Sequence, residues 1–161
     1  SVSKIEALIA QLPDAEVSAR ILHAVDQSFS KVLRHDERLE KTRISSFHRV
    51  RVMFKKFRYL VESVHSLVPH FPEDNLTRMH VYQTALGKIQ DAEVLLQALS
   101  DFARHDRTCD LGLPLRFYER RRAAYISVYL KNRRDVFAFW RAAPENSFAW
   151  EQEPRSPRKS K

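Results

Sequence analysis

The chain has few of the residues that make tight turns or covalent cross-links. Its 161 residues include two glycines and one cysteine, Cys109. Because hairpin turns need residues that tolerate positive φ, so few glycines argue against a β architecture built from hairpins. A single cysteine excludes an intramolecular disulfide and is typical of a reducing compartment, so we expect a cytoplasmic protein. No run of about 18 apolar residues occurs, so we expect no membrane-spanning helix.

What the sequence does contain is an excess of positive charge on a chain with enough apolar residues to fold. The formal net charge is +8 at pH 7, and 43% of the residues are hydrophobic. This hydrophobic content is too high for a disordered polycation. The positive charge favours an anionic partner such as nucleic acid, polyphosphate or an anionic membrane surface. The plain alternative is that the charge serves solubility alone.

Apolar residues recur every three or four positions in several windows, which predicts an all-α fold. We expect one bundle of about five helices, with long antiparallel helices. The first is a short helix that ends at Pro13. The others are expected over residues 14–40, 45–68, 73–103 and 114–143. Gly87, inside the fourth, costs about 1 kcal/mol relative to alanine, so we expect another helix to approach it closely.

We assign residues 1–143 to the helical domain and residues 144–161 to a basic, flexible tail. Beyond residue 144 the helical pattern decays, and the last residues combine proline with lysine and arginine. Phe148 and Trp150 are the two residues of this tail that could dock on the helical body.

The segment from Phe47 to Glu62 contains neither glycine nor proline and alternates apolar with cationic residues. At about 100° per residue, its apolar residues form one stripe of a helix. An adjoining arc carries His48, Arg51, Lys55, Arg58 and Glu62. Its cations stand about one turn apart, so a linear polyanion could contact each in turn. A protonated His48 would tighten such binding as the pH falls. The alternative is a surface stripe that pairs with carboxylates of neighbouring helices.

A second set of cations lies on one face of the fifth predicted helix, opposite its aromatic side. We infer that four of them form the other wall of an anion-binding groove. These four are Arg116, Arg120, Lys131 and Arg134. This inference rests on helical spacing alone.

The order of residues from His48 to Glu62 is His-x-x-Arg-Val-x-x-Lys-Lys-x-Arg-Tyr-x-x-Glu. It closely resembles the signature helix of the CHAD family, the conserved histidine α-helical domain. Leu86, Gly87 and Asp91 resemble a second element of that family, Leu-Gly-x-x-x-Asp, in the expected order and at a plausible distance. The detailed resemblance spans residues 46–99.

The resemblance implies a helical bundle that binds inorganic polyphosphate in a basic groove or pore, without known catalysis of its own. We expect no metal and no cofactor. Association with polyphosphate granules in the cytoplasm is compatible with this resemblance. The polyphosphate-binding positions that match the family are His48, Arg51, Lys55, Lys56 and Arg58. Tyr59 and Glu62 match positions that we expect to pack and orient. We infer that Asp91 pairs with one of the signature cations and holds it in place, because an unpaired carboxylate would oppose anion binding.

The chain departs from the family in one respect, since CHAD domains usually carry two signatures and this chain has one. It is therefore a half-domain, a divergent fragment, or a protomer that completes the bundle as a homodimer about a two-fold axis.

Three other classes remain in competition at this point. The net charge also suits a nucleic-acid-binding helical protein, although no recognition-helix or finger motif is present. A structural or interaction scaffold would use the cations in salt bridges between helices. An enzyme has the weakest support: His35-Asp36 and His105-Asp106 are dipeptides that metal-dependent phosphohydrolases use, but they lack a set of partner histidines. No phosphate-binding loop occurs. We therefore expect a binding protein.

Overall fold

The structure is a computed structural model, and it describes residues 14–152. This part of the chain contains the helices α2 (Asp14–Glu37), α3 (Ile44–Val64), α4 (Asn75–His105) and α5 (Gly112–Asn132). It also contains the short 3-10 helices η1 (His65–Leu67), η2 (Arg133–Ala138) and η3 (Ala149–Glu151), and no strand. The all-α prediction is confirmed. The short helix expected before Pro13 lies outside the described residues.

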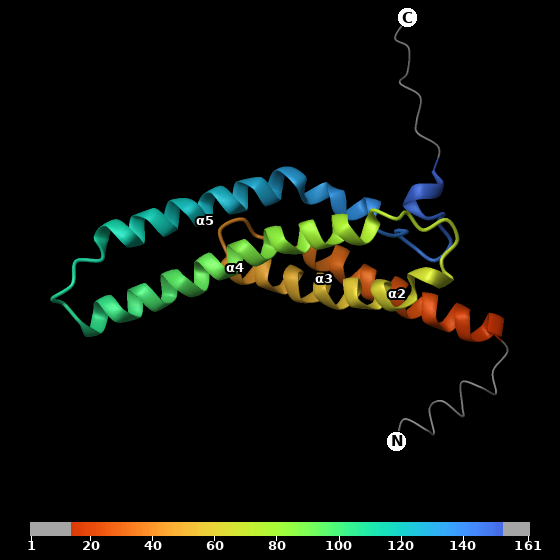
Figure 1. Cartoon of the computed structure of the whole chain (residues 1–161), viewed down its shortest axis with the longest axis horizontal. Coiled ribbons are helices and arrows are strands. Elements are labelled where there is room, and N and C mark those ends of the chain that lie inside the picture. Colours follow the sequence, from red (N-terminus) through yellow and green to blue (C-terminus); the bar gives the residue numbers. More distant parts are fainter. Residues whose placement is uncertain (1–13, 153–161) are drawn as a thin grey trace, which may run out of the picture.

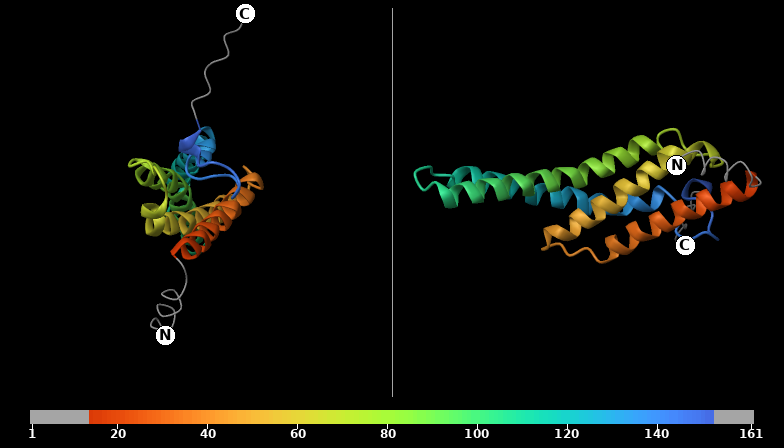
Figure 2. Two further views of the ribbon diagram at one scale, coloured as in Figure 1. Left: turned by 90° about the vertical axis from the view of Figure 1, so that its right-hand side faces the viewer. Right: turned by 90° about the horizontal axis from the view of Figure 1, so that it is seen from below.

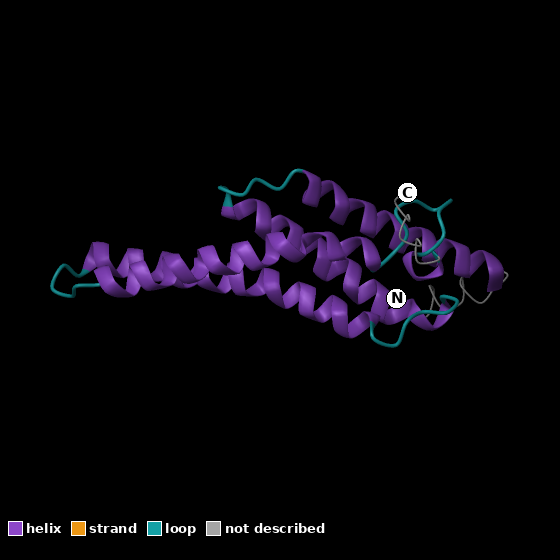
Figure 3. Cartoon of the chain, turned by 90° about the horizontal axis from the view of Figure 1, so that it is seen from above, coloured by secondary structure: helices purple, strands orange, loops and turns teal. Residues whose placement is uncertain are grey.

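The helices pack in chain order, α2 on α3, α3 on α4 and α4 on α5, and neighbours run antiparallel (Figure 1). The end-on view shows them arranged about the long axis (Figure 2), and buried residues from all four form one hydrophobic core. The hairpin of α4 and α5 extends beyond the other two helices, and the loop that joins them lies at the far end of the molecule (Figures 1 and 3). The molecule is therefore a four-helix bundle over part of its length, and only α4 and α5 continue to the end where the loop between them lies.

The core forms around the apolar stripe of α3. Phe54 and Phe57 are fully buried. The Phe57 ring lies 4.8 Å from that of Phe29 on α2, and the Phe54 ring lies 4.6 Å from that of Tyr82 on α4. Burying each such side chain contributes about 1.5–3 kcal/mol. This packing fixes the rotation of α3, so the neighbouring cationic arc must lie beside the core.

Helix α5 ends earlier than the apolar pattern predicts. We expected one helix to residue 143, but the α-helix stops at Asn132 and η2 follows. The tighter winding of a 3-10 helix changes which side chains face inward. Val136 within η2 and Phe139 and Trp140 beyond it are buried, whereas Val128, still within α5, is 56% exposed.

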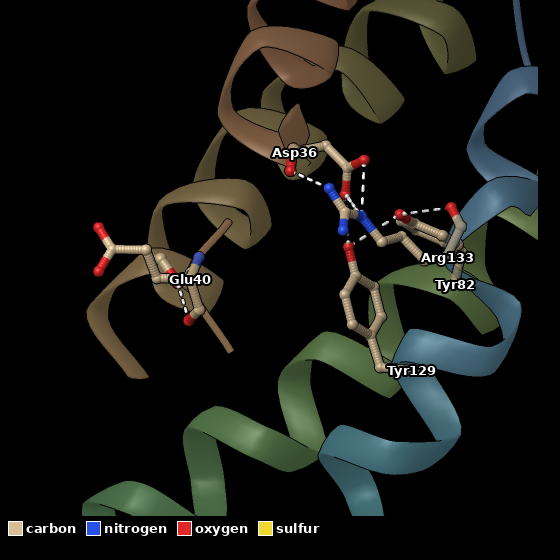
Figure 4. Close-up of polar contacts among 6 residues, drawn as sticks. Asp36, Glu40, Tyr82, Tyr129 and Arg133 are labelled. Atoms are coloured by element: carbon tan, nitrogen blue, oxygen red, sulfur yellow. Dashed lines mark hydrogen bonds and ion pairs between the residues drawn. The ribbon is translucent and has the colours of Figure 1, made fainter. Parts of the chain in front are cut away.

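Buried carboxylates of α2 hold the segment after α5 in this position. Asp36 accepts a hydrogen bond from Arg133 Nε at 2.8 Å and one from the Tyr129 hydroxyl at 3.2 Å (Figure 4). Tyr82 completes the cluster, with its hydroxyl oxygen 3.0 Å from that of Tyr129. Burial raises the pKa of both tyrosine hydroxyls, which keeps them neutral.

A second buried carboxylate of α2, Asp26, binds the segment that follows η2. It accepts hydrogen bonds from Trp140 Nε1 at 2.8 Å and from Arg141 Nη2 at 2.7 Å. Beyond it, the Phe148 and Trp150 rings stack 4.8 Å apart, and Trp150 Nε1 donates to the Pro69 carbonyl at 3.2 Å. These two aromatic residues therefore dock on the body. The domain boundary after residue 143 stays a prediction, and residues 153–161 lie outside the described part.

Candidate anion-binding site

The cationic arc of α3 lies along the line where α3 packs against α4. His48 Nδ1 donates to Gln90 Oε1 at 2.9 Å, and Arg58 Nε donates to Gln83 Oε1 at 2.8 Å. Between them, Arg51 Nε is the nearest atom to a Cβ built on Gly87, at 4.0 Å. The three α4 residues are spaced by four and three, so they share one face of α4.

We use the name α3–α4 seam for this set of residues. Its members are His48, Arg51, Lys55 and Arg58 of α3 with Gln83, Gly87 and Gln90 of α4. The structure thus brings together four of the cations that the sequence singled out, on one side of the core.

Arg51 is the least satisfied of these cations. Its Nε is buried and has no hydrogen-bond partner in the described part of the chain. Within residues 14–152, no carboxylate lies within ion-pair distance of Arg51 or Lys55. A buried donor without an acceptor costs about 1–3 kcal/mol. A phosphate oxygen would supply that acceptor, because arginine binds phosphate through charge-assisted, forked hydrogen bonds.

Arg58 is bound in a different way. It is only 9% exposed and forms an ion pair with Glu62. Its guanidinium also lies 4.8 Å from the centre of the Tyr59 ring. Glu62 and Tyr59 therefore hold Arg58, as an orienting role requires, and part of the Arg58 charge is neutralised within the protein.

The two neighbouring lysines differ in position. Lys55 follows Arg51 by one turn on the seam side, and its Nζ lies 5.6 Å from the Tyr59 ring centre. Lys56 is exposed and falls about 100° further round α3, away from α4. The structure does not bring Lys56 to the seam.

Asp91 does not occupy the position that we inferred for it. It is exposed and lines a hollow between α4 and α5, together with Lys88 and Arg121. No ion pair joins it to a signature cation in the described residues. The reason is its position on α4: residue 91 falls about 100° round the helix from Gln90, on the solvent side between α3 and α5.

The cations of the last part of the chain also lie elsewhere. The inward face of α5 is marked by Tyr129, which is buried, and by Arg122, which pairs with Glu93 of α4. The four residues that we expected to form a second wall are Arg116, Arg120, Lys131 and Arg134, and all four are exposed. On α5, the first three fall on the side opposite Tyr129. The second wall of the seam is α4, so the structure does not bring these four cations to it.

Sequence reasoning missed Gln83 and Gln90. Amide side chains carry no charge and leave no signal in a search for cationic rows. Their spacing to Gly87, four and three residues, is the signal that could have identified this face of α4.

The residues that suggested an enzyme are used in the structure for other contacts. Asp36 binds Arg133, while Asp106 accepts the backbone N–H of Thr108 at 2.9 Å. Hydrogen bonds from Thr108 lower the pKa of Asp106. Across residues 14–152, no three His, Cys, Asp or Glu side chains are grouped so that they could hold a metal ion. In the same residues, no helix combines the length and apolar character needed to cross a membrane.

Fold and site together define the class as an antiparallel helical bundle with a cation-lined seam. The family model described as CHAD domain matches residues 2–100. This match covers more than half of the chain, and the protein belongs to the CHAD family. The matched region contains the whole α3–α4 seam and ends before α5. CHAD domains are generally binding domains associated with polyphosphate. Comparisons with curated proteins and with solved structures gave no match.

Proposed function

We propose that this protein binds inorganic polyphosphate, or a similar linear polyanion, along the α3–α4 seam without catalysing its breakdown. The observation that carries the proposal is Arg51, whose buried Nε has no acceptor within residues 14–152. On the same face of α3, His48 and Lys55 are exposed. The family's association with polyphosphate supports the same ligand.

The dimensions of the seam suit a repeating anion. With a rise of about 1.5 Å per residue, the Cα atoms of His48 and Arg58 are about 15 Å apart along the helix axis. Several consecutive phosphates span that length and can meet one cation after another. Because Glu62 already pairs with Arg58, the part from His48 to Lys55 carries most of the charge left for a ligand.

Cations outside the seam have a different role in this proposal. Lys56 and the α5 cations contribute to the net charge of +8, which raises the encounter rate with any polyanion. They are expected to affect association more than the stability of the complex.

The proposal is tested by titrating the full chain with long-chain polyphosphate at low and moderate salt. Arg51→Gln and Lys55→Gln are each expected to raise Kd about tenfold, since each removes a seam cation. Lys31→Gln is the matched control, because Lys31 is an exposed α2 lysine without an ion pair in the described residues. A Kd that Arg51→Gln leaves at the wild-type value would contradict the seam as the binding site and favour the scaffold function.

Competition separates polyphosphate from nucleic acid. Duplex DNA should compete weakly with polyphosphate, because only the few phosphates of a duplex that face a straight row of cations can meet it, whereas a single flexible chain can follow the whole row. Equal affinity for both would instead indicate a nucleic-acid-binding protein. Release of orthophosphate by the pure protein with a divalent metal would overturn the non-catalytic part of the proposal.

A further inference from the structure

Helix α4 carries a second pattern, on the solvent side between α3 and α5. From Thr77 to Phe102, exposed residues follow one another at alternating spacings of four and three. Alternation of four and three is the heptad repeat of a coiled coil, in which one helix face meets a partner helix. Val81 is 63% exposed and Phe102 is 51% exposed, although both are large apolar residues. We call this row of eight residues the outer stripe.

The outer stripe is complementary in charge to a second copy of itself that runs in the opposite direction. Its midpoint lies between Lys88 and Asp91, a cation and an anion three residues apart. In an antiparallel pair of α4 helices related by a two-fold axis at that point, Lys88 of each copy faces Asp91 of the other. Neither residue forms an ion pair within residues 14–152. A polar pair at the centre of an otherwise less polar stripe is the device that fixes register in coiled coils.

The remaining positions of the outer stripe match by size in the same register. Leu95 of one copy faces Thr84 of the other, and Phe102 faces Thr77. The last pair is Val81 with Ala98. Each large side chain therefore meets a smaller one, which is the condition for interdigitated packing.

Two hollows beside the outer stripe can receive a partner's side chains. One, of about 700 Å³, is lined by Val81, Thr84 and Lys88, and on α5 by Val128. The other, of about 180 Å³, adjoins it at Lys88 and continues along Asp91 and Leu95. Val128 is 56% exposed, so the apolar surface extends from α4 onto α5.

We propose that the outer stripe is the docking surface for a second copy of this chain, paired antiparallel about a two-fold axis between Lys88 and Asp91. Charge and size complementarity in one register identify the second copy as the occupant, because an isologous interface must be self-complementary. The pairing rests on the outer stripe and does not depend on the polyphosphate proposal.

The pairing has a consequence for the α3–α4 seam. The seam and the outer stripe are about 100° apart around α4. A two-fold axis perpendicular to the plane of the two α4 helices keeps both seams on the same side of that plane. One face of the dimer then presents two cationic seams, which a single long polyanion can bind together with higher avidity than one seam. This consequence does rest on the proposed function.

The test is a charge exchange in the full chain, read by sedimentation equilibrium up to about 100 µM. Lys88→Asp and Asp91→Lys each place like charges opposite one another twice, so each is expected to raise the dimer dissociation constant about tenfold or more. An equimolar mixture of the two variants should recover the dimer, because both contacts become attractive in the mixed pair. Lys31→Asp makes the same charge change as Lys88→Asp but on α2, and this variant should show the same average molecular mass in solution as the wild type.

Three results would overturn the pairing: a monomeric wild type at the highest concentration, single variants that stay dimeric, or a mixture that stays monomeric. Helical circular dichroism of each variant verifies that it is folded. Polyphosphate titration keeps the two proposals distinct. A monomeric wild type that binds polyphosphate contradicts the pairing alone, whereas a dimeric wild type that does not bind it contradicts the seam alone.

Discussion

At the scale of single residues, two arginines on one face of α3 behave differently. Arg58 is held by Glu62 and Gln83, whereas Arg51 Nε is buried without an acceptor among the described residues. Both occupy the same cationic arc in sequence. The Glu62 carboxylate one turn further along α3 and the Gln83 amide of α4 bind Arg58, and Arg51 Nε has no such acceptor among the described residues.

Stability measurements should separate these two arginines. We expect Arg58→Gln to lower the free energy of unfolding by about 1–3 kcal/mol, because Glu62 and Gln83 lose their partner. Arg51→Gln should leave it unchanged or raise it by up to about 1–3 kcal/mol, because the variant loses no hydrogen bond of Nε and removes a buried donor that has no acceptor. Urea unfolding of both variants checks this. A loss of stability for Arg51→Gln would mean that Arg51 is a packing residue.

Gly87 is the second residue whose role the structure changes. We expected a helix to approach it closely, but a Cβ at this position would meet only Arg51 Nε, at the ordinary contact distance of 4.0 Å. Gly87→Ala should therefore raise the free energy of unfolding by about 0.5–1 kcal/mol through helix propensity. A higher urea midpoint with unchanged slope is the expected result. Destabilisation would show that α3 and α4 pack more closely than the structure has them.

At the scale of elements, a helix can be predicted from sequence when nearby residues determine where it ends, and it cannot when a distant residue does. The apolar stripe of α3 is complete within its own sequence, and Val50, Phe54, Phe57 and Val61 are all buried. The end of α5 depends on Asp36, almost a hundred residues earlier in the chain, which binds Arg133 just after the last helical turn. Local periodicity contains no information about such a contact.

The buried tyrosines between α2, α4 and α5 give this part of the fold a pH dependence. Burial raises the pKa of Tyr82 and of Tyr129, so the folded state favours their neutral forms. Their stabilisation is complete below the ordinary tyrosine pKa of about 10 and is lost as the pH rises above it. In an alkaline titration, we expect two of the five tyrosines to ionise together with loss of helicity. Tyr129→Phe should leave one late-ionising tyrosine, and ionisation of all five before unfolding would contradict the buried cluster.

For the whole molecule, the sequence predicted the class and the family, and it singled out one wall of the candidate site. The α3 wall could be predicted because charge and periodicity coincide there. The α4 wall was missed, because a glycine and two uncharged amides give no cationic signal, and their four-and-three spacing does not say which helix that face of α4 packs against. The same limit explains the α5 cations, since a charged helix face shows no sign of which neighbour it lies beside.

The central claim is that a linear polyanion binds along the α3–α4 seam, and arginine side-chain NMR tests it most directly. The Nε–H resonance of each arginine can be followed as polyphosphate is added to the labelled protein, with Arg51 assigned from the spectrum of Arg51→Lys. We predict a large, saturable shift for Arg51, with small shifts for Arg116 and Arg120 on the projecting hairpin. A spectrum in which Arg51 does not move while Arg116 and Arg120 do would contradict the account.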